Sequence, residues 1–314
     1  MTDDLRAQQS MTPQIETGQG RPIEVNERSG VLEPTNLRRF DARWFTPAPE
    51  VRDAVDAYWS VEWDLPPGQS VVQQILEFPA VTLSFESGCV PAPLMLTGAQ
   101  RRAWSRTITG TGTVFALRLR PAGLATVSDL VATDLDREQP VTPDLDARLM
   151  GVMAEIAAGE STADRVSRAD RIIGGLLRVR PPTESQILAN AVVDALAGEV
   201  AQRPGASLAE QIGRSERSIH RALRATLGMG RKAVARRIRL QEVVRRLSMP
   251  GADASDIAAA LGYVDQAHLI RDFSGVAGMT PGRYVRQLRT VQSPEVEPAR
   301  PTSVGSSATG RRDQ

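Results

Sequence analysis

Four side chains that carry hydrogen-bond donors recur every three or four residues between positions 215 and 225 of the 314-residue chain. They are Arg217, His220, Arg221 and Arg224. This spacing places them on one face of a helix, and an apolar set that includes Ile219 and Leu223 occupies the opposite face. A helix fits the roughly 12 Å wide major groove of DNA, where a guanidinium can donate two hydrogen bonds to guanine. The pattern predicts contacts to base edges, against the alternative of an ordinary solvated helix face.

A second face of this kind lies about fifty residues further along the chain. It consists of Gln266, Ile270 and Arg271, with His268 at its flank, while Leu269 and Phe273 point inward. Glutamine can pair with adenine, and an aliphatic side chain can touch the methyl group of thymine. Two such faces in register favour nucleic-acid recognition over two coincidental solvated faces.

The elements that position both faces form an internal repeat. The segments 208–213 and 257–262 are each followed by a short turn and a second helix, which ends at Gly-Met at 228–229 and again at 278–279. Gly213 and Gly262 fit a sharp turn with positive φ, and Ser215 and Asp265 are good N-caps. Two helix-turn-helix units are therefore predicted. An apolar stripe over 232–248 predicts a long helix between them, and Arg237 on this helix is a candidate phosphate contact.

The run from Leu208 to Tyr284 resembles the DNA-binding domain of AraC/XylS-type regulators, above all in the segments 260–263, 265–273 and 278–281. The resemblance implies seven helices, with two recognition helices in successive major grooves. The chain departs from the family pattern at Gly230-Arg231, where a Ser-Pro pair is usual, and at Val234, which replaces an aromatic residue. The segments 58–61 and 115–123 resemble a domain of unknown function that precedes the DNA-binding part in one branch of these regulators, which implies sensing or self-association.

Charge and composition agree with a nucleic-acid partner. Residues 184–290 carry a net charge of +6 and residues 40–183 one of −4, so the second half suits a polyanion. The chain has no apolar run of the roughly 20 residues that cross a bilayer, and its start lacks the features of a secretory signal. We therefore expect a cytoplasmic protein without membrane contacts.

Catalysis and cofactor binding are not expected. Both histidines, His220 and His268, lie outside the N-terminal half, which excludes a histidine metal site or a Ser-His-Asp triad confined to that half. The single cysteine, Cys89, cannot form an internal disulfide. It is either a redox or alkylation sensor or a packed or exposed thiol, and we favour the second interpretation.

The predicted fold class is α+β. Residues 40–180 alternate apolar and polar side chains and then become helical, which predicts an antiparallel β-sandwich or barrel with accessory helices. Hairpin turns are expected at 110–112 and 66–68. Residues 181–290 are expected to form the all-α DNA-binding domain, and residues 1–39 and 291–314 disordered tails. An apolar stripe around Ile173 is expected to pack in the N-terminal core or, alternatively, across a two-fold interface.

Several N-terminal side chains have two interpretations. Trp59, Trp63 and Trp104 lie in predicted strands and belong either to the core or to an apolar effector pocket. Arg118 and Arg120 point away from the apolar side of their strand, so they either contact an anionic effector or form a solvated sheet face, which we favour.

The sequence thus predicts a sequence-specific DNA-binding transcription regulator, with an N-terminal half that modulates it through an unknown effector or through self-association. Double-stranded DNA is the expected partner, and RNA polymerase, a small-molecule effector and a second copy of the chain remain open as further partners. The alternatives are a DNA repair or modification enzyme that carries the same module and an architectural protein with weak sequence preference.

Overall fold

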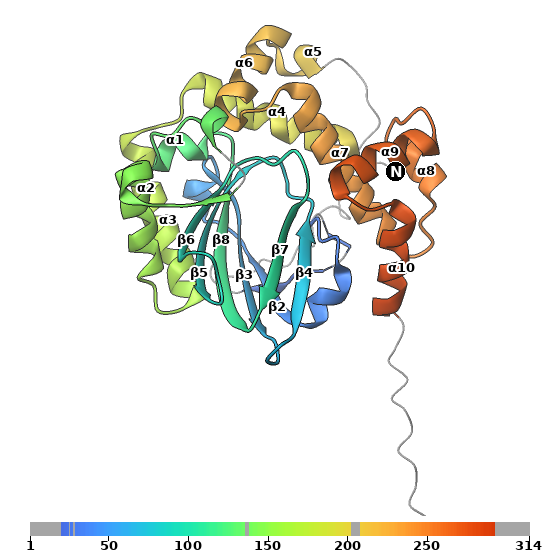
Figure 1. The fold of residues 1–314 in the computed structure, drawn as a ribbon. Coiled ribbons are helices and arrows are strands. Elements are labelled where there is room, and N and C mark those ends of the chain that lie inside the picture. Colours follow the sequence, from blue (N-terminus) through green and yellow to red (C-terminus); the bar gives the residue numbers. More distant parts are fainter. Residues whose placement is uncertain (1–19, 25, 28, 136–137, 202–207, 293–314) are drawn as a thin grey trace, which may run out of the picture.

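The computed structural model of the chain describes residues 20–24, 26–27, 29–135, 138–201 and 208–292. Strands dominate the N-terminal part, and helices surround them (Figure 1). The strands are β1 (Arg21–Pro22), β2 (Phe40–Phe45), β3 (Val55–Asp64), β4 (Ser70–Ile75), β5 (Val81–Gly88), β6 (Leu94–Thr97), β7 (Trp104–Thr109), β8 (Thr111–Leu119) and β9 (Glu138–Pro140).

The strands form two antiparallel sheets. One has the order β1-β2-β3-β8-β5-β6-β9, and the other consists of β4 and β7. The predicted fold class of an antiparallel sheet domain followed by helices is confirmed.

The helices follow mostly after the strands. They are α1 (Gly123–Val127), α2 (Pro143–Ala157), α3 (Thr162–Val179), α4 (Glu184–Ala201), α5 (Leu208–Ile212), α6 (Glu216–Leu227), α7 (Arg231–Leu247), α8 (Ala254–Ala260), α9 (Gln266–Ala277) and α10 (Pro281–Gln292). Three short 3-10 helices, η1 (Pro34–Arg38), η2 (Pro49–Val51) and η3 (Ala132–Asp134), connect other elements.

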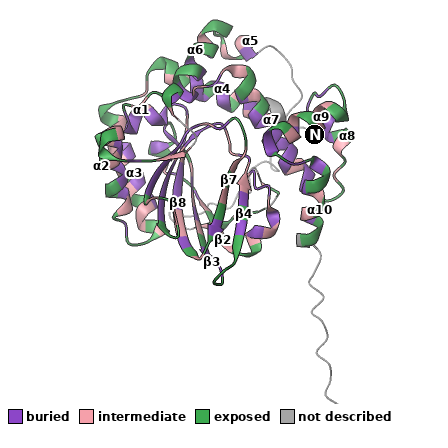
Figure 2. Cartoon of the chain, in the orientation of Figure 1, coloured by how far each residue is buried: buried purple, intermediate pink, exposed green. Residues whose placement is uncertain are grey.

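The large sheet is covered on both faces, which explains its side-chain pattern. Phe115 and Leu117 of β8 are buried in a core that also contains residues of α2 and α3, among them Ile173 with 0% exposure. The alternate residues Ala116 and Arg118 point to the other face, which the small sheet covers. The interpretation of Arg118 as part of a solvated sheet face is therefore wrong, whereas the packing of Ile173 in the N-terminal core is confirmed. Figure 2 shows buried residues along these strands and on the helix faces turned toward them.

Both predicted hairpins are wrong in the same way. Gly110 and Gly68 do adopt positive φ values of 54° and 80° in tight turns. However, β7 pairs with β4 and not with the next strand β8, and β4 does not pair with the preceding β3. Each turn therefore passes the chain from one sheet to the other, a distinction that local turn residues do not encode.

Part of the predicted N-terminal tail is ordered, which corrects that prediction for the described residues 20–24, 26–27 and 29–39. Leu32 is fully buried, and Asn36 donates hydrogen bonds from its Nδ2 to the Val72 carbonyl at 2.9 Å and to Gln73 Oε1 at 2.8 Å. This segment has too few apolar residues to show a periodic pattern. It adds single apolar residues such as Leu32 to a core that other parts of the chain build. Residues 1–19 and 293–314 lie outside the described residues.

Seven helices, α4 to α10, make up the described C-terminal part, as the resemblance implied. Helix α7 divides their apolar residues into two cores. Its first half, with Val234 and Ile238, packs with α4, α5 and α6. Its second half packs with α8, α9 and α10 and also with Leu32 and Leu76 of the N-terminal part.

The N-terminal and C-terminal parts are in direct contact. On α4, Asn190 accepts a hydrogen bond from the Ala122 amide at 3.1 Å and donates one to the Asp53 carbonyl at 2.8 Å. Arg120 forms an ion pair with Asp194 of the same helix at 2.6 Å. The prolines at 181–182 lie between α3 and α4, where the predicted domain boundary falls. Helix α4 nevertheless packs against the N-terminal part through these contacts.

Candidate nucleic-acid interface

The first helix-turn-helix unit consists of α5, a turn at Gly213 and α6. Gly213 has a φ of 65°, as expected for the turn, and the Ser215 side chain accepts a hydrogen bond from the Ser218 amide at 3.2 Å. This cap satisfies one of the free amides at the start of α6. The helix ends at Gly228, whose φ of 67° terminates it in the left-handed region. The sequence thus determines where α6 begins and ends.

The outer face of α6 carries all four residues predicted for it. Arg217, His220, Arg221 and Arg224 are exposed. Ile219 on the inner face is fully buried. In the part of the chain that the structure describes, the three arginines have no ion pair. Their guanidinium groups are therefore available to a ligand.

The second unit repeats this geometry with α8, the turn at Gly262 and α9. Gly262 has a φ of 71°, and Asp265 caps α9 by accepting a hydrogen bond from the His268 amide at 2.6 Å. Gln266 and Arg271 are exposed on α9, whereas His268 and Ile270 are half-buried. The His268 ring packs edge-on against Tyr263, with ring centroids 5.2 Å apart.

An aspartate next to Arg271 fixes α9 to its neighbours. Asp272 accepts hydrogen bonds from the Tyr263 hydroxyl at 3.0 Å and from Arg236 Nε of α7 at 2.5 Å. Burial and the neighbouring Asp272 carboxylate raise the pKa of the Tyr263 phenol, so this hydroxyl remains a donor. Arg239 of α7 lies over the Tyr263 ring at 5.5 Å. No role was predicted for Asp272 and Tyr263 from the sequence, although the phenol and the carboxylate lie nine residues apart.

Most arginines of α7 form contacts within the protein. Arg245 and Arg246 form ion pairs with the buried Glu242 at 2.7 and 2.8 Å. Arg237 is 3% exposed and donates to the carbonyls of Glu77 at 2.9 Å and Arg102 at 2.8 Å. Its predicted contact to phosphate does not fit this conformation, because the guanidinium lies between the two parts of the chain.

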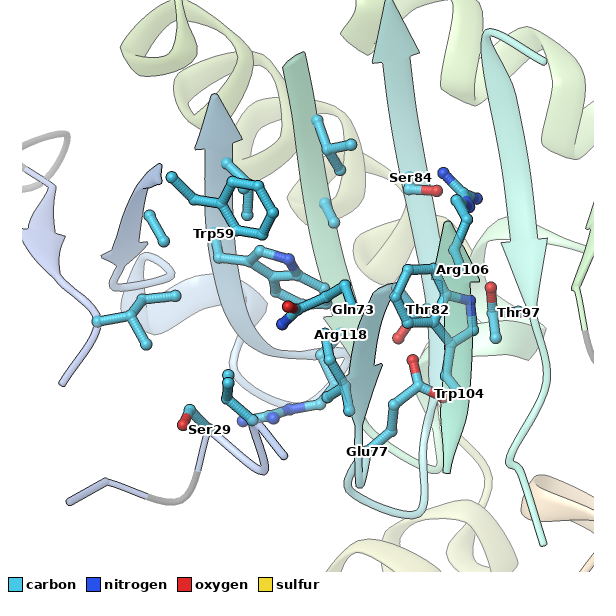
Figure 3. Close-up of a pocket in the computed structure, with 18 of the residues that line it drawn as sticks. Ser29, Trp59, Gln73, Glu77, Thr82, Ser84, Thr97, Trp104, Arg106 and Arg118 are labelled. Atoms are coloured by element: carbon cyan, nitrogen blue, oxygen red, sulfur yellow. The ribbon is translucent and has the colours of Figure 1, made fainter. Parts of the chain in front are cut away.

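The N-terminal part contains a cavity of about 160 Å³ between its two sheets (Figure 3). The three tryptophans with two interpretations, Trp59, Trp63 and Trp104, all line it, and so does Arg118. Arg120 does not, because it pairs with Asp194. Cys89 is exposed outside this cavity. Within the described residues, no cluster of three or more His, Cys, Asp or Glu side chains is placed to hold a metal ion.

Two family models match the chain. Residues 208–287 match the family described as a helix-turn-helix domain. Residues 43–139 match the family described as a domain of unknown function, DUF6597. A search of curated proteins gave no match. In the described part of the chain, no helix has the length and apolar character to cross a membrane.

Several solved structures of ToxT from Vibrio cholerae are similar in outline. A 1.65 Å structure in the P21 form has 10% identity and a TM-score of 0.41, covering 74% of this chain and 99% of that one. The structure from strain O395 has 10% identity and a TM-score of 0.39, with coverages of 80% and 98%.

The helix-turn-helix match and the geometry of the two units point to the same function. Each unit presents a capped helix whose outer face carries hydrogen-bond donors, and the match spans both units. The chain is therefore a DNA-binding transcription regulator, and the match of residues 208–287 to a helix-turn-helix domain agrees with its resemblance to AraC/XylS-type regulators.

Proposed function

We propose that α6 and α9 are the two recognition helices and that each contacts bases in one of two successive major grooves. The observation that carries this proposal is the pair of capped helices at opposite halves of α7, both with exposed donor-bearing faces. The proposed contacts are Arg217, His220, Arg221 and Arg224 from α6, and Gln266, His268, Ile270 and Arg271 from α9.

The two helices would then recognise different sequences. The arginines of α6 suit guanine, whereas Gln266 suits adenine and Ile270 suits a thymine methyl group. Two units of one rigid domain should face the same side of the duplex about 34 Å, or roughly 10 base pairs, apart. The proposed target of one chain is therefore a non-palindromic pair of half-sites.

In the same proposal, the N-terminal part modulates this binding through a small molecule in its cavity, and the chain acts in the cytoplasm without catalysing a reaction. Aromatic walls with a few polar side chains are typical of small-molecule sites. RNA polymerase would be the partner through which the DNA-bound chain controls transcription. A second copy of the chain, bound to an adjacent site, would be a further partner.

The test is selection from a randomised DNA library at fixed salt with the full chain. Arg221→Ala and Arg271→Ala should each weaken binding by about 1–3 kcal/mol and relax base preference only in their own half-site. Arg171→Ala is the matched control, because Arg171 is an exposed arginine on α3, far from either unit in sequence. If Arg271→Ala weakened all sequences equally, α9 would hold the backbone only and the proposal for α9 would be wrong.

A salt titration tests the wider proposal of a DNA-binding regulator. The logarithm of the affinity should fall with the logarithm of salt concentration by about 0.9 for each phosphate contacted. A specific site should be preferred over random DNA by about 10³-fold or more. A flat titration would contradict DNA binding, and equal affinity for all sequences would favour the architectural alternative.

A further inference from the structure

The cavity wall is unusually rich in aromatic side chains for a chain with so few of them. All four tryptophans of the protein, Trp44, Trp59, Trp63 and Trp104, line it, although only 4% of the residues are aromatic. They come from strands β2, β3 and β7, so both sheets contribute. Figure 3 labels Trp59 of the large sheet and Trp104 of the small sheet. A volume of about 160 Å³ is close to that of a cavity that accommodates a single benzene ring. The space therefore suits a small flat molecule.

Two arginine side chains of the protein already lie over tryptophan rings of this cavity wall. The Arg106 guanidinium lies over the Trp104 ring at 5.2 Å, and the Arg118 guanidinium lies over Trp44 at 5.7 Å. Tryptophan faces attract cations because of their negative quadrupole. The same attraction is open to a cation that enters from solvent.

Each of these two arginines already has a carboxylate partner. Arg106 pairs with Glu86 at 2.6 Å and with Glu138 at 2.5 Å. Arg118 pairs with Asp56 at 2.5 Å. An anionic ligand would therefore have to compete with existing ion pairs for both guanidinium groups.

The acid without such a partner is Glu77. Its carboxylate lines the cavity and forms no hydrogen bond or ion pair with the described residues. Arg237 of α7 is near, but its Nε and one terminal nitrogen donate to the carbonyls of Glu77 and Arg102. Of the charged side chains that line the cavity, the acids Glu77, Glu86 and Glu138 outnumber the bases Arg106 and Arg118 by one.

Glu77 also has the protonation behaviour of an acid that lacks a counter-ion. Burial raises its pKa to about 7 and Glu138 adds to this effect, although Arg237 from α7 and Arg118 from β8 oppose it. A cation bound beside Glu77 would favour the ionised form.

We propose that the cavity binds a flat, apolar organic cation of about one aromatic ring, held between the tryptophan side chains with its charge against the Glu77 carboxylate. This inference depends on the proposed effector role of the cavity and names the class of effector. A neutral ring would gain only the apolar contacts, and an anion would meet the excess negative charge.

The experiment compares N-methylpyridinium with toluene, which has the same shape without the charge, and with benzoate as an anion. Each is titrated into the ¹⁵N-labelled full chain, and the four indole N–H resonances report binding, because all four tryptophans line the cavity. We expect the cation to bind at least about tenfold more tightly than toluene. Glu77→Gln should remove this preference, whereas Glu62→Gln, an exposed acid on β3, should retain it. An unchanged indole spectrum without ligand shows that each variant is folded.

The pH dependence gives a second test that needs no variant. N-methylpyridinium does not titrate, so its affinity should follow the ionised fraction of Glu77 and rise about tenfold between pH 6 and pH 8. Toluene affinity should stay constant. Equal binding of toluene, or tighter binding of benzoate, would contradict the proposed positive charge of the ligand. The cavity would then bind an effector of another chemical class. No binding by any of the three would overturn both the inference and the effector role, but not the DNA binding measured separately.

Discussion

The contacts that hold recognition helix α9 in place predict which substitution loosens it most. The Tyr263 hydroxyl, in a residue that is 6% exposed, donates to the carboxylate of Asp272, which is 12% exposed at its side chain. Arg236 donates to the same carboxylate, but the Arg236 side chain is 48% exposed. A hydrogen bond to a charged acceptor contributes about 1.5–3 kcal/mol, whereas a solvent-exposed ion pair contributes about 0–1 kcal/mol. Tyr263→Phe should therefore destabilise α9 more than Arg236→Ala.

The assay is hydrogen exchange of the α9 amides in the full chain, followed by mass spectrometry. Since each 1.4 kcal/mol corresponds to about tenfold, Tyr263→Phe should speed exchange of these amides by roughly 10- to 100-fold, and Arg236→Ala by less than about fivefold. The amides of α2 in the N-terminal part serve as the internal control. The variant Asp272→Asn, combined with Tyr263→Phe, closes a double-mutant cycle that isolates the coupling of the two side chains.

Two results would refute this reasoning. If Arg236→Ala accelerated exchange as much as Tyr263→Phe, the exposed ion pair would be the stronger contact and the burial argument would be wrong. If neither variant changed the exchange of α9, the apolar contacts of Leu269 and Phe273 would be sufficient to hold the helix.

Three further predictions concern stability. Ile173→Glu places a carboxylate in the N-terminal core, where Ile173 has 0% exposure; the domain should unfold, and a folded monomer with native tryptophan fluorescence would contradict its core role. Gly228→Ala should destabilise the chain in urea more than Gly278→Ala, because both have φ near 70° but only at Gly228 would the new Cβ meet a backbone oxygen, 2.8 Å away in η3; equal losses would exclude that contact. The Asp146 carboxylate is partly desolvated, which raises its pKa, but hydrogen bonds from Ser128 and backbone amides outweigh this and lower the pKa. The ionised form is therefore favoured in the folded state, and its stabilisation should be lost as pH falls through the folded pKa; Asp146→Asn should reduce this acid sensitivity, measured as the dependence of Tm on pH.

The helix-turn-helix units were predictable from sequence because their determinants are local. A capping side chain such as Ser215 or Asp265 and a glycine at positive φ determine each helix end without help from distant residues. The apolar spacing of α6 likewise determined which face is buried, since Ile219 is buried and Arg221 is exposed.

The two-sheet arrangement was not predictable by the same reasoning, because it depends on long-range pairing. Alternation along β8 separates Leu117 from Arg118, but it does not reveal whether the second face meets water or another sheet. Arg237 illustrates the same limit on α7. Its sequence position suits phosphate contact, yet the fold brings the carbonyls of Glu77 and Arg102 to its guanidinium.

Helix α7 is the structural connection between the cavity and the two recognition helices. Its first half shares a core with α6 and its second half shares one with α9, so it carries both units. The same helix donates hydrogen bonds from Arg237 to the Glu77 carbonyl and from Gln241 Nε2 to the Leu76 carbonyl at 2.7 Å. Glu77 thus faces the cavity with its carboxylate and holds α7 with its backbone. Both α7 side chains are at most 3% exposed, so water cannot readily replace these bonds. A displacement of the Leu76–Glu77 segment must therefore either move α7 with it or leave buried groups unpaired, and a movement of α7 reaches both helices that face DNA.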